Sequence, residues 1–238
     1  MKKEDIRKLV WDRMLREGIA RFPLPPHGRI PNFMGAEKAA ERLAALEPFA
    51  RAEVLKINPD SPQRPVRYWA LSSGKKVVMP TPRIRRGFLL LDPEKIPRNA
   101  LGYASTIKGA FRYGALIKPW NLPRIDAAVV GSVAVDTEGR RIGKGEGYSE
   151  IEFGVLVEVG VLDREAPIAT TVHDVQVLPP PLPTDPWDVS VDYTITPTRV
   201  IRAVNRPPRP KGILWDLMPE KKIEEIPILR ELRKRIRR

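Results

Sequence analysis

The chain has 238 residues with a formal net charge of +13, two histidines and no cysteine. The absence of cysteine excludes disulfides, thiol nucleophiles and cysteine-based metal sites, and two histidines are too few for a His-rich zinc site. No apolar run reaches the ~18 residues of a membrane helix and the N-terminus has no apolar signal core, so we expect a cytoplasmic protein.

The positive charge has three interpretations that composition leaves open. A basic chain suits nucleic acid, a phosphorylated ligand, or the charge-rich surface of a thermophile. Abundant charge, 26 prolines and no cysteine are typical of a thermophile. A marked basic excess follows Asn205, so the rest of the chain is less basic than the net charge indicates.

An amphipathic helix is predicted for residues 3–17, where Ile6, Val10 and Met14 recur at helical spacing. Lys3 and Arg7 are four residues apart and share one face of that helix. The pair is either a solvated edge or a clamp for phosphate groups.

Prolines punctuate residues 22–33, which excludes regular structure there. Long structured loops of this kind either carry function or wrap the body as extended segments. Arg29 and Asn32 are the candidate ligand-binding residues of this loop. The alternative is that the loop only packs side chains such as Ile30 and Phe33.

The middle of the chain alternates between predicted helices and short strands. Helices are predicted for residues 35–46 and 104–113, with a turn at 119–123. A basic loop at residues 80–86 follows one strand, and ligands bind at the carboxyl ends of strands in α/β sheets. This loop is either a ligand site or a solvated connection. Strands are predicted at residues 53–57, 67–71, 76–79 and 87–91.

A glycine-rich loop at residues 139–150 follows a mostly apolar strand at 127–135 and precedes an amphipathic helix at 151–162. Strand, glycine loop and helix together present backbone N–H groups and a helix N-terminus to an anion. The glycine spacing matches neither a Walker A loop nor a dinucleotide-binding fingerprint. Spacing alone leaves two interpretations open, a phosphate-binding loop and a tight turn with solvated cations.

The last third of the chain returns to strands and then changes in character. Because strands alternate with helices, we predict a three-layer α/β fold with a mostly parallel sheet and helices on both faces. Residues 206–238 form a basic extension after a proline-rich linker, predicted either to pack a short helix on the body or to bind nucleic acid. Strands are predicted at residues 167–172, 193–196 and 199–203, with a polyproline-like crossover at 179–186.

Six short segments, spread along the chain, carry a family resemblance. They are Phe33-Met-Gly-Ala36, Pro80-Thr-Pro-Arg83, Val130-Gly-Ser-Val-Ala-Val135, Arg141-Ile-Gly-Lys-Gly-Glu-Gly-Tyr148, His173-Asp-Val-Gln176 and Thr196-Pro-Thr-Arg199. On these segments the chain resembles the 5-formyltetrahydrofolate cyclo-ligase (methenyltetrahydrofolate synthetase) family over residues 1–203. It is most similar to the branch of methenyltetrahydrofolate synthetase domain-containing proteins. The resemblance implies an α/β domain at residues 1–205, of the kind found in sugar-phosphate isomerases and CoA transferases.

The resemblance also implies which residues hold ATP and magnesium. In the family, an N-terminal Lys-x-x-x-Arg and a later glycine-rich segment both bind the ATP phosphates. The two metal-binding carboxylates of the family correspond to Glu150 and Asp188, and oxygen ligands suit Mg²⁺. The implied ATP-binding residues are Lys3, Arg7, Arg141, Gly143, Lys144, Gly145, Glu146, Gly147 and Tyr148.

The implied reaction is an ATP- and Mg²⁺-dependent ring closure of 5-formyltetrahydrofolate, or a related pterin, to the 5,10-methenyl form. The formyl oxygen is phosphorylated, N10 attacks the activated carbon, and phosphate and ADP are released. Positioning and charge carry such chemistry, so Lys144 and Tyr148 are assigned catalytic roles. The substrate-binding residues are assigned as Arg29, Phe33 and Arg83.

The glycine segment departs from the family pattern at its end. Ser149 stands where the family has Tyr, Glu150 where it has Asp, and Ile151 where an Arg is frequent. The alternative function is therefore a non-catalytic protein that binds a nucleotide or RNA on the same fold.

Overall fold

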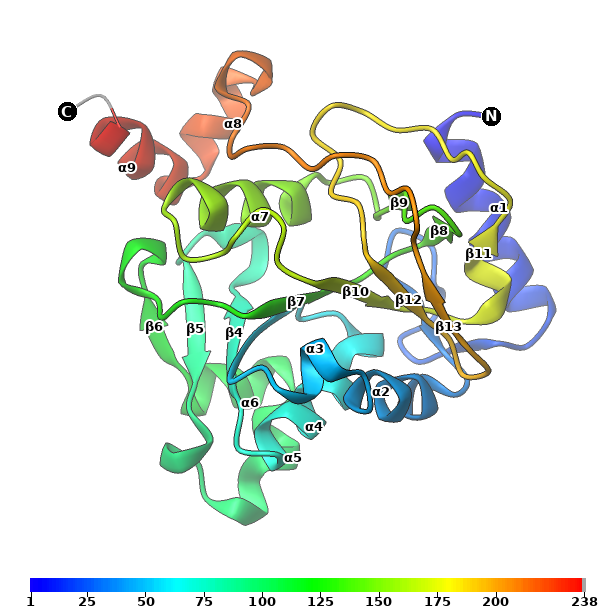
Figure 1. Ribbon diagram of the computed structural model, residues 1–238, viewed down its shortest axis with the longest axis horizontal. Helices are drawn as coiled ribbons and strands as arrows, with labels where there is room; N and C mark the ends of the chain where they lie inside the picture. Colours follow the sequence, from blue (N-terminus) through cyan, green and yellow to red (C-terminus); the bar gives the residue numbers. More distant parts are fainter. Residues whose placement is uncertain (237–238) are drawn as a thin grey trace.

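An eight-stranded sheet runs through the centre of the protein, whose computed structural model describes residues 1–236 (Figure 1). The strand order is β13-β12-β10-β7-β3-β4-β5-β6, and the run from β12 to β4 is parallel. β13, β5 and β6 are antiparallel to their neighbours. The strands are β3 (Val54–Ile57), β4 (Lys76–Pro80), β5 (Phe88–Leu91), β6 (Ala115–Ile117), β7 (Ala127–Val130), β10 (Ile168–Thr171), β12 (Tyr193–Ile195) and β13 (Val200–Arg202).

Helices cover both faces of this sheet, which confirms the predicted three-layer α/β fold. α2 and α4 pack on one face and α7 on the other (Figure 1). β3, β7 and β10 are buried along their whole length, and β7 is a continuous apolar run, as expected of a strand covered on both faces. No helix within residues 1–236 is both long and apolar enough to cross a membrane. The helices are α1 (Lys3–Arg16), α2 (Ala36–Ala44), α3 (Glu47–Ala50), α4 (Arg64–Ser72), α5 (Leu101–Ala104), α6 (Ile107–Tyr113), α7 (Tyr148–Glu158), α8 (Glu220–Glu225) and α9 (Pro227–Ile236).

The apolar run at residues 127–135 is two strands, where one was predicted. β7 ends at Val130, and the chain continues into a separate three-stranded sheet of order β11-β8-β9. At Gly131 an added Cβ would lie 2.8 Å from the side chain of Ile30, so this close approach requires glycine and interrupts the strand. The strands of this smaller sheet are β8 (Ala134–Asp136), β9 (Arg141–Ile142) and β11 (Val177–Leu178).

The predicted strand at residues 67–71 is wrong, because these residues lie inside helix α4. Pro65 sits in the first turn of this helix, where proline is tolerated. Val66 and Ala70, four residues apart, are fully buried on the side that faces the sheet. A short apolar run does not distinguish strand from buried helix, which is why the sequence pattern misled.

Two further predicted boundaries change in the structure. The helix expected at residues 104–113 is the pair α5 and α6, and Thr106 caps α6 by accepting a hydrogen bond from the Gly109 N–H at 3.0 Å. The proline-punctuated loop is closed by a small hairpin, so residues 22–33 are not wholly irregular. Its strands are β1 (Ala20–Arg21) and β2 (Asn32–Phe33).

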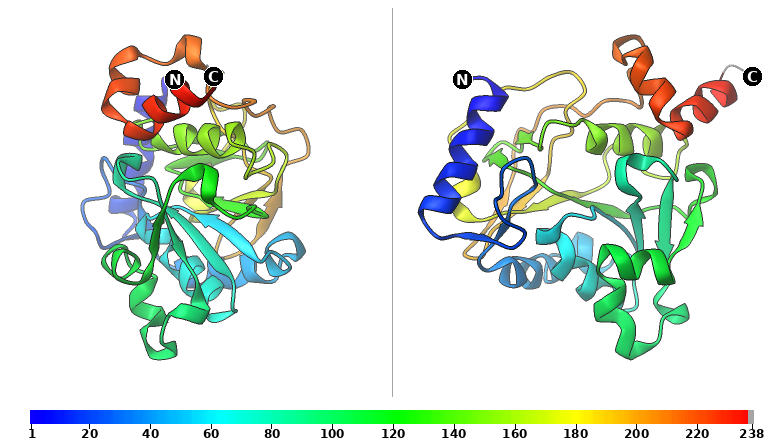
Figure 2. Two further views of the ribbon diagram at one scale, coloured as in Figure 1. Left: turned by 90° about the vertical axis from the view of Figure 1, so that its left-hand side faces the viewer. Right: turned by 180° about the vertical axis from the view of Figure 1, so that it is seen from behind.

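Helix α7 was expected to be amphipathic, but the C-terminal extension covers its outer side. Every residue from 151 to 156 is buried, and the Ile213 side chain packs against Gly154. α8 and α9 lie over α7, away from α2 and α4, in all three views (Figures 1 and 2). The extension buries five apolar side chains from its two helices and the residue between them: Ile223, Ile226, Ile228, Leu229 and Leu232.

The predicted basic end of the extension is partly neutralised by carboxylates. Arg233 pairs with Glu220 at 2.7 Å, and Arg230 lies 4.0 Å from Glu224. Residues 237 and 238, the end of the predicted extension, lie outside the described residues. The division into a domain at 1–205 and an extension at 206–238, and nucleic acid as its partner, stay predictions.

Candidate active site

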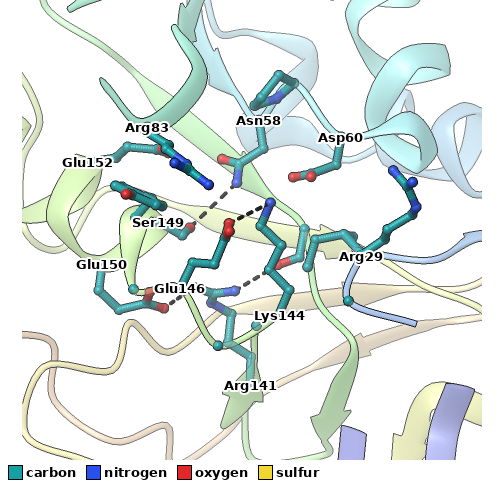
Figure 3. A pocket seen from close by; sticks show the side chains of 18 of the residues that line it. Arg29, Asn58, Asp60, Arg83, Arg141, Lys144, Glu146, Ser149, Glu150 and Glu152 are labelled. Atoms are coloured by element: carbon teal, nitrogen blue, oxygen red, sulfur yellow. Dashed lines mark hydrogen bonds and ion pairs between the residues drawn. The ribbon is translucent and has the colours of Figure 1, made fainter. Parts of the chain in front are cut away.

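A cavity of about 550 Å³ opens at the carboxyl ends of β3, β4 and β7. This is the edge at which open α/β sheets bind ligands. Its walls come from α1, the proline-rich loop, the β4–β5 loop, the glycine loop and the segment before β12. Figure 3 shows Arg29, Arg83 and side chains of the glycine loop around the cavity. Of the predicted site residues, all but Asn32 and Phe33 line it.

The glycine loop forms one wall of the cavity and is hydrogen-bonded to helix α1. Arg7 donates from Nε to the carbonyl oxygen of Gly143 at 2.7 Å. Gly145 has φ +99°, and an added Cβ would lie 3.1 Å from the Arg7 guanidinium carbon. Gly145 is therefore favoured by its backbone conformation, and a side chain there would crowd Arg7.

Helix α7 begins directly after the glycine loop and points its N-terminus at the cavity wall. Gly147 precedes its first residue with φ +75°, a left-handed conformation that favours glycine. Tyr148, Ser149 and Glu150 make up the first turn and line the cavity. The N–H groups of a first helical turn have no intrahelical partners and attract anions.

Lys3 faces two carboxylates across the cavity mouth. Its Nζ lies 2.7 Å from Asp185 Oδ2 and also contacts Asp188 Oδ2. The Asp185 backbone N–H donates to the same Asp188 oxygen at 2.7 Å. The predicted pair of Lys3 and Arg7 thus occupies the cavity, and its lysine is ion-paired rather than merely solvated.

Arg141 is almost fully buried and joins the glycine loop to the sheet. It donates to the carbonyl oxygens of Gly131 at 2.7 Å and Val189 at 3.2 Å, and it pairs with Glu150. Most of its donors are therefore used within the protein. Arg141 therefore orients Glu150 and lines the cavity.

Lys144 extends from the glycine loop into the cavity, toward Asp60 (Figure 3). Its side chain is 36% exposed and pairs with Glu146 at 2.8 Å. Enclosure in the cavity raises the pKa of Asp60, while the positive charges of Lys144 and Arg67 oppose that rise. A cation and a carboxylate of raised pKa therefore share this part of the cavity.

A buried ion pair lies near this cavity, and the sequence did not predict it. Lys56 on β3 pairs with Glu152 on α7 at 2.7 Å, with both side chains less than a tenth exposed. Lys56 also donates to Asn58 Oδ1. Burial raises the pKa of the Glu152 carboxyl, and the charge of Lys56 opposes the rise.

Signals for these residues were present in the sequence. Asn58 and Asp60 directly follow the predicted strand at residues 53–57, at the strand end where ligands are expected. Lys56 and Glu152 are charged residues inside apolar runs, which is unusual unless the charge is paired. What the sequence could not indicate is that the two charges are partners 96 residues apart.

Two predicted roles in the proline-rich loop are not supported by the structure. Phe33 is only 2% exposed, lies in the hydrophobic core, and packs edge-on against His173, so its assignment to substrate binding is wrong. Asn32 donates from Nδ2 to the carbonyl oxygen of Phe22 at 2.9 Å and does not line the cavity. Arg29 does line it.

The basic loop after β4 also reaches the cavity. Thr81, Pro82 and Arg83 all line it. Arg83 has φ +54°, a conformation that is uncommon for residues other than glycine and is found at ligand-binding turns. The loop therefore belongs to the cavity, and its role as a ligand site stays a prediction.

The side chains of Glu150 and Asp188 have the chemistry of Mg²⁺ ligands. Both line the cavity and present carboxylate oxygens, which fits a cation that takes one or two carboxylates together with phosphate oxygens. Each is paired with a cation in this structure, Glu150 with Arg141 and Asp188 with Lys3. Within residues 1–236 no cluster of three or more His, Cys, Asp or Glu could hold a metal by itself. The donor set thus fits a metal shared with a phosphorylated ligand.

Comparison with known proteins identifies relatives along nearly the whole chain. The sequence model of the 5-formyltetrahydrofolate cyclo-ligase family matches residues 2–197. The methenyltetrahydrofolate synthase domain-containing proteins of Bos taurus and Homo sapiens are each 41% identical to this chain, over 97% and 98% of its length. The chain spans only 62% of the length of each of these relatives.

One solved structure has the same fold at low sequence identity. It is the NMR structure of Aquifex aeolicus 5,10-methenyltetrahydrofolate synthetase, which is 20% identical and has a TM-score of 0.55. The match covers 87% of this chain and 95% of that one.

Proposed function

The chain belongs to the 5-formyltetrahydrofolate cyclo-ligase family, and from this premise we propose that it is an ATP- and Mg²⁺-dependent ligase. Its substrate is 5-formyltetrahydrofolate or a related pterin, and its products are the 5,10-methenyl form, ADP and phosphate. One observation carries the proposal. Lys3 and Arg7 at the start of the chain share a cavity with the glycine loop, more than 130 residues later.

The phosphate groups would bind at the glycine loop. Lys144 supplies an accessible cation, and the first turn of α7 supplies backbone N–H groups. Arg7 contributes positive charge while holding the loop through Gly143. The catalytic role assigned to Lys144 is to offset the charge on the transferring phosphoryl group, which is the main demand of such a reaction.

The carboxylates Glu150 and Asp188 would hold Mg²⁺ together with phosphate oxygens. When bound, the metal supplies charge neutralisation for the phosphates. Arg141 keeps Glu150 oriented by pairing with it and by donating to the Gly131 carbonyl. Lys3 holds Asp188 in the cavity.

Ring closure needs an acceptor for the proton that leaves N10. The formyl oxygen takes the γ-phosphoryl group, N10 attacks the formyl carbon, and that oxygen departs in the phosphate. Asp60 is the candidate acceptor, because a carboxylate of raised pKa is a better base near neutral pH. The pterin would lie between Asp60, Arg29 and Arg83, which line the same cavity.

The experiment is a turnover assay with purified protein, ATP, Mg²⁺ and 5-formyltetrahydrofolate. Methenyl product, followed by its absorbance, should appear together with an equal amount of ADP. Omitting ATP or adding a chelator is the control and should abolish product. No product at any temperature at which the protein stays folded would overturn the substrate assignment.

One observation favours a second function. Ser149 and Ile151 replace residues that the family pattern carries at the end of its glycine segment. ATP binding without turnover on 5-formyltetrahydrofolate or other formylated pterins would support a nucleotide-binding protein on the same fold. If the protein neither bound ATP nor turned over a formylated pterin, the nucleotide assignment itself would be contradicted.

A further inference from the structure

The C-terminal extension reaches the glycine loop through one side chain. Lys222 on α8 lies with its Nζ 4.0 Å from the centre of the Tyr148 ring. The same Nζ donates to the backbone carbonyl oxygen of Glu146 at 3.2 Å. One cation thus bridges Gly147, with one partner on each side of it.

Lys222 touches the loop from outside the cavity, which it does not line. Its effect on a bound ligand would therefore pass through the loop. Glu146 is the link, because its carbonyl accepts from Lys222 while its carboxylate pairs with Lys144 at 2.8 Å. Lys144 is the cation that we place on the phosphates.

The loop needs such support because of its composition. Gly143, Gly145 and Gly147 each lack the side chain that restricts backbone motion, so ordering this segment is entropically costly. Arg7 holds the first half of the loop at Gly143. Lys222 holds the second half at Glu146, from the opposite end of the chain.

The position of Lys222 is set by burial of the residues next to it. Ile223 is 2% exposed and Ile226 1% exposed, both packed in the core that contains α7. The lysine stem therefore starts from an anchored turn of helix. Lys221, one residue earlier, is exposed and provides a matched control.

We propose that Lys222 is a positioning residue of the phosphate-binding loop, so that the C-terminal extension completes a site built by the first 200 residues. The family match ends at residue 197, and Lys222 lies beyond it. This inference rests on the proposed function, because it takes the ligand of the loop to be ATP. Cation–π and charge-assisted contacts of this kind each change binding by about threefold to thirtyfold.

The test uses the full chain with Lys222→Met, which keeps the stem length but removes the charge and the donor. The dissociation constant for Mg–ATP, measured by calorimetry, should rise about tenfold, and the melting temperature of the free protein should fall by no more than about 2–4 °C. Lys222→Arg should restore most of the affinity, and Lys221→Met should leave it unchanged. Equal ATP affinity in Lys222→Met and the unaltered protein would overturn the proposal.

A second readout does not depend on ATP. Amide hydrogen exchange of residues 144–148 in the free protein should be faster in Lys222→Met than in Lys221→Met. If the unaltered protein binds no ATP, the proposed function fails, yet this exchange difference still tests the positioning. Identical exchange in both variants would show that Lys222 does not order the loop.

Discussion

At the scale of single residues, the nucleotide assignment depends most on Lys144. It points into the cavity from the glycine loop, and its recorded ion pair is with Glu146, a neighbour on the same loop. Lys144→Ala should weaken Mg–ATP binding by about tenfold to a hundredfold, because a charged contact to phosphate is lost. Calorimetry measures this, with unfolding curves to check the fold.

Lys38→Ala is the matched control for that variant, since Lys38 is exposed on α2 and does not line the cavity. It should bind ATP as the unaltered protein does. If Lys144→Ala retained the same affinity, Lys144 would be a solvated turn residue and the phosphate site would have to lie elsewhere.

Asp60 gives a prediction about pH. Because enclosure raises its pKa, the folded state binds this proton more tightly than the unfolded state does. The stability linked to Asp60 is therefore complete below its ordinary pKa of 3.8 and is lost as pH rises through the folded value. Asp60→Asn should be more stable than the unaltered protein at neutral pH, with less difference near pH 3.8.

Urea unfolding at several pH values measures this effect. The same variant should lose turnover if Asp60 accepts the N10 proton. A stability difference that stays constant with pH would contradict the raised pKa. Full turnover in Asp60→Asn would exclude Asp60 as the base.

At the scale of elements, α9 is part of the core rather than a loose basic tail. Leu229 is fully buried against the layer that contains α7. Leu229→Ala should lower the free energy of unfolding by about 2–5 kcal/mol, through lost burial and the cavity left behind. Ile236→Ala, half exposed on the same helix, is the control and should change little. Equal stability of the two variants would mean that the extension folds independently.

The burial of α7 also explains why Glu152 has a buried cation as its partner. Covered on both sides, this helix brings Glu152 into the interior, where only the partner Lys56 makes its charge tolerable. The His173 to Gln176 turn supports a different segment, the one that follows β7, because Gln176 donates to the carbonyls of Ser132 and Val133 at 3.1 Å. That motif is therefore structural in this protein, next to the turn at which β7 ends.

At the scale of the whole molecule, the acidic residues of the cavity matter more than the net charge of +13. Asp188 and Glu150 are the carboxylates that we assign to Mg²⁺. A chelator should abolish turnover, and Asp188→Asn should raise the Mg²⁺ concentration for half-maximal activity by about tenfold or more. Asp163→Asn, on the surface and outside the cavity, should leave it unchanged. Unaltered Mg²⁺ dependence in Asp188→Asn would remove that residue from the metal site.

The sequence by itself determined the type of fold and many of the residues that line the cavity. Apolar runs such as residues 127–130 indicate buried strands because burial on both faces leaves no polar alternation. Local spacing singled out the glycine segment and Lys3 as candidates, and the family resemblance was needed to assign them to ATP. Phe33 was assigned wrongly because an aromatic side chain in a functional loop has the same sequence signature as one in the core.

Only the tertiary structure decided which distant residues are partners. Lys56 and Glu152, or Lys222 and Tyr148, are joined by packing of elements far apart in the chain, and no local pattern encodes such a contact. The same reason explains α7: its pattern could not reveal a second covering layer supplied by residues more than 50 positions later. Burial is a property of the assembled layers, so the role of a charged or apolar residue is settled only when its neighbours are known.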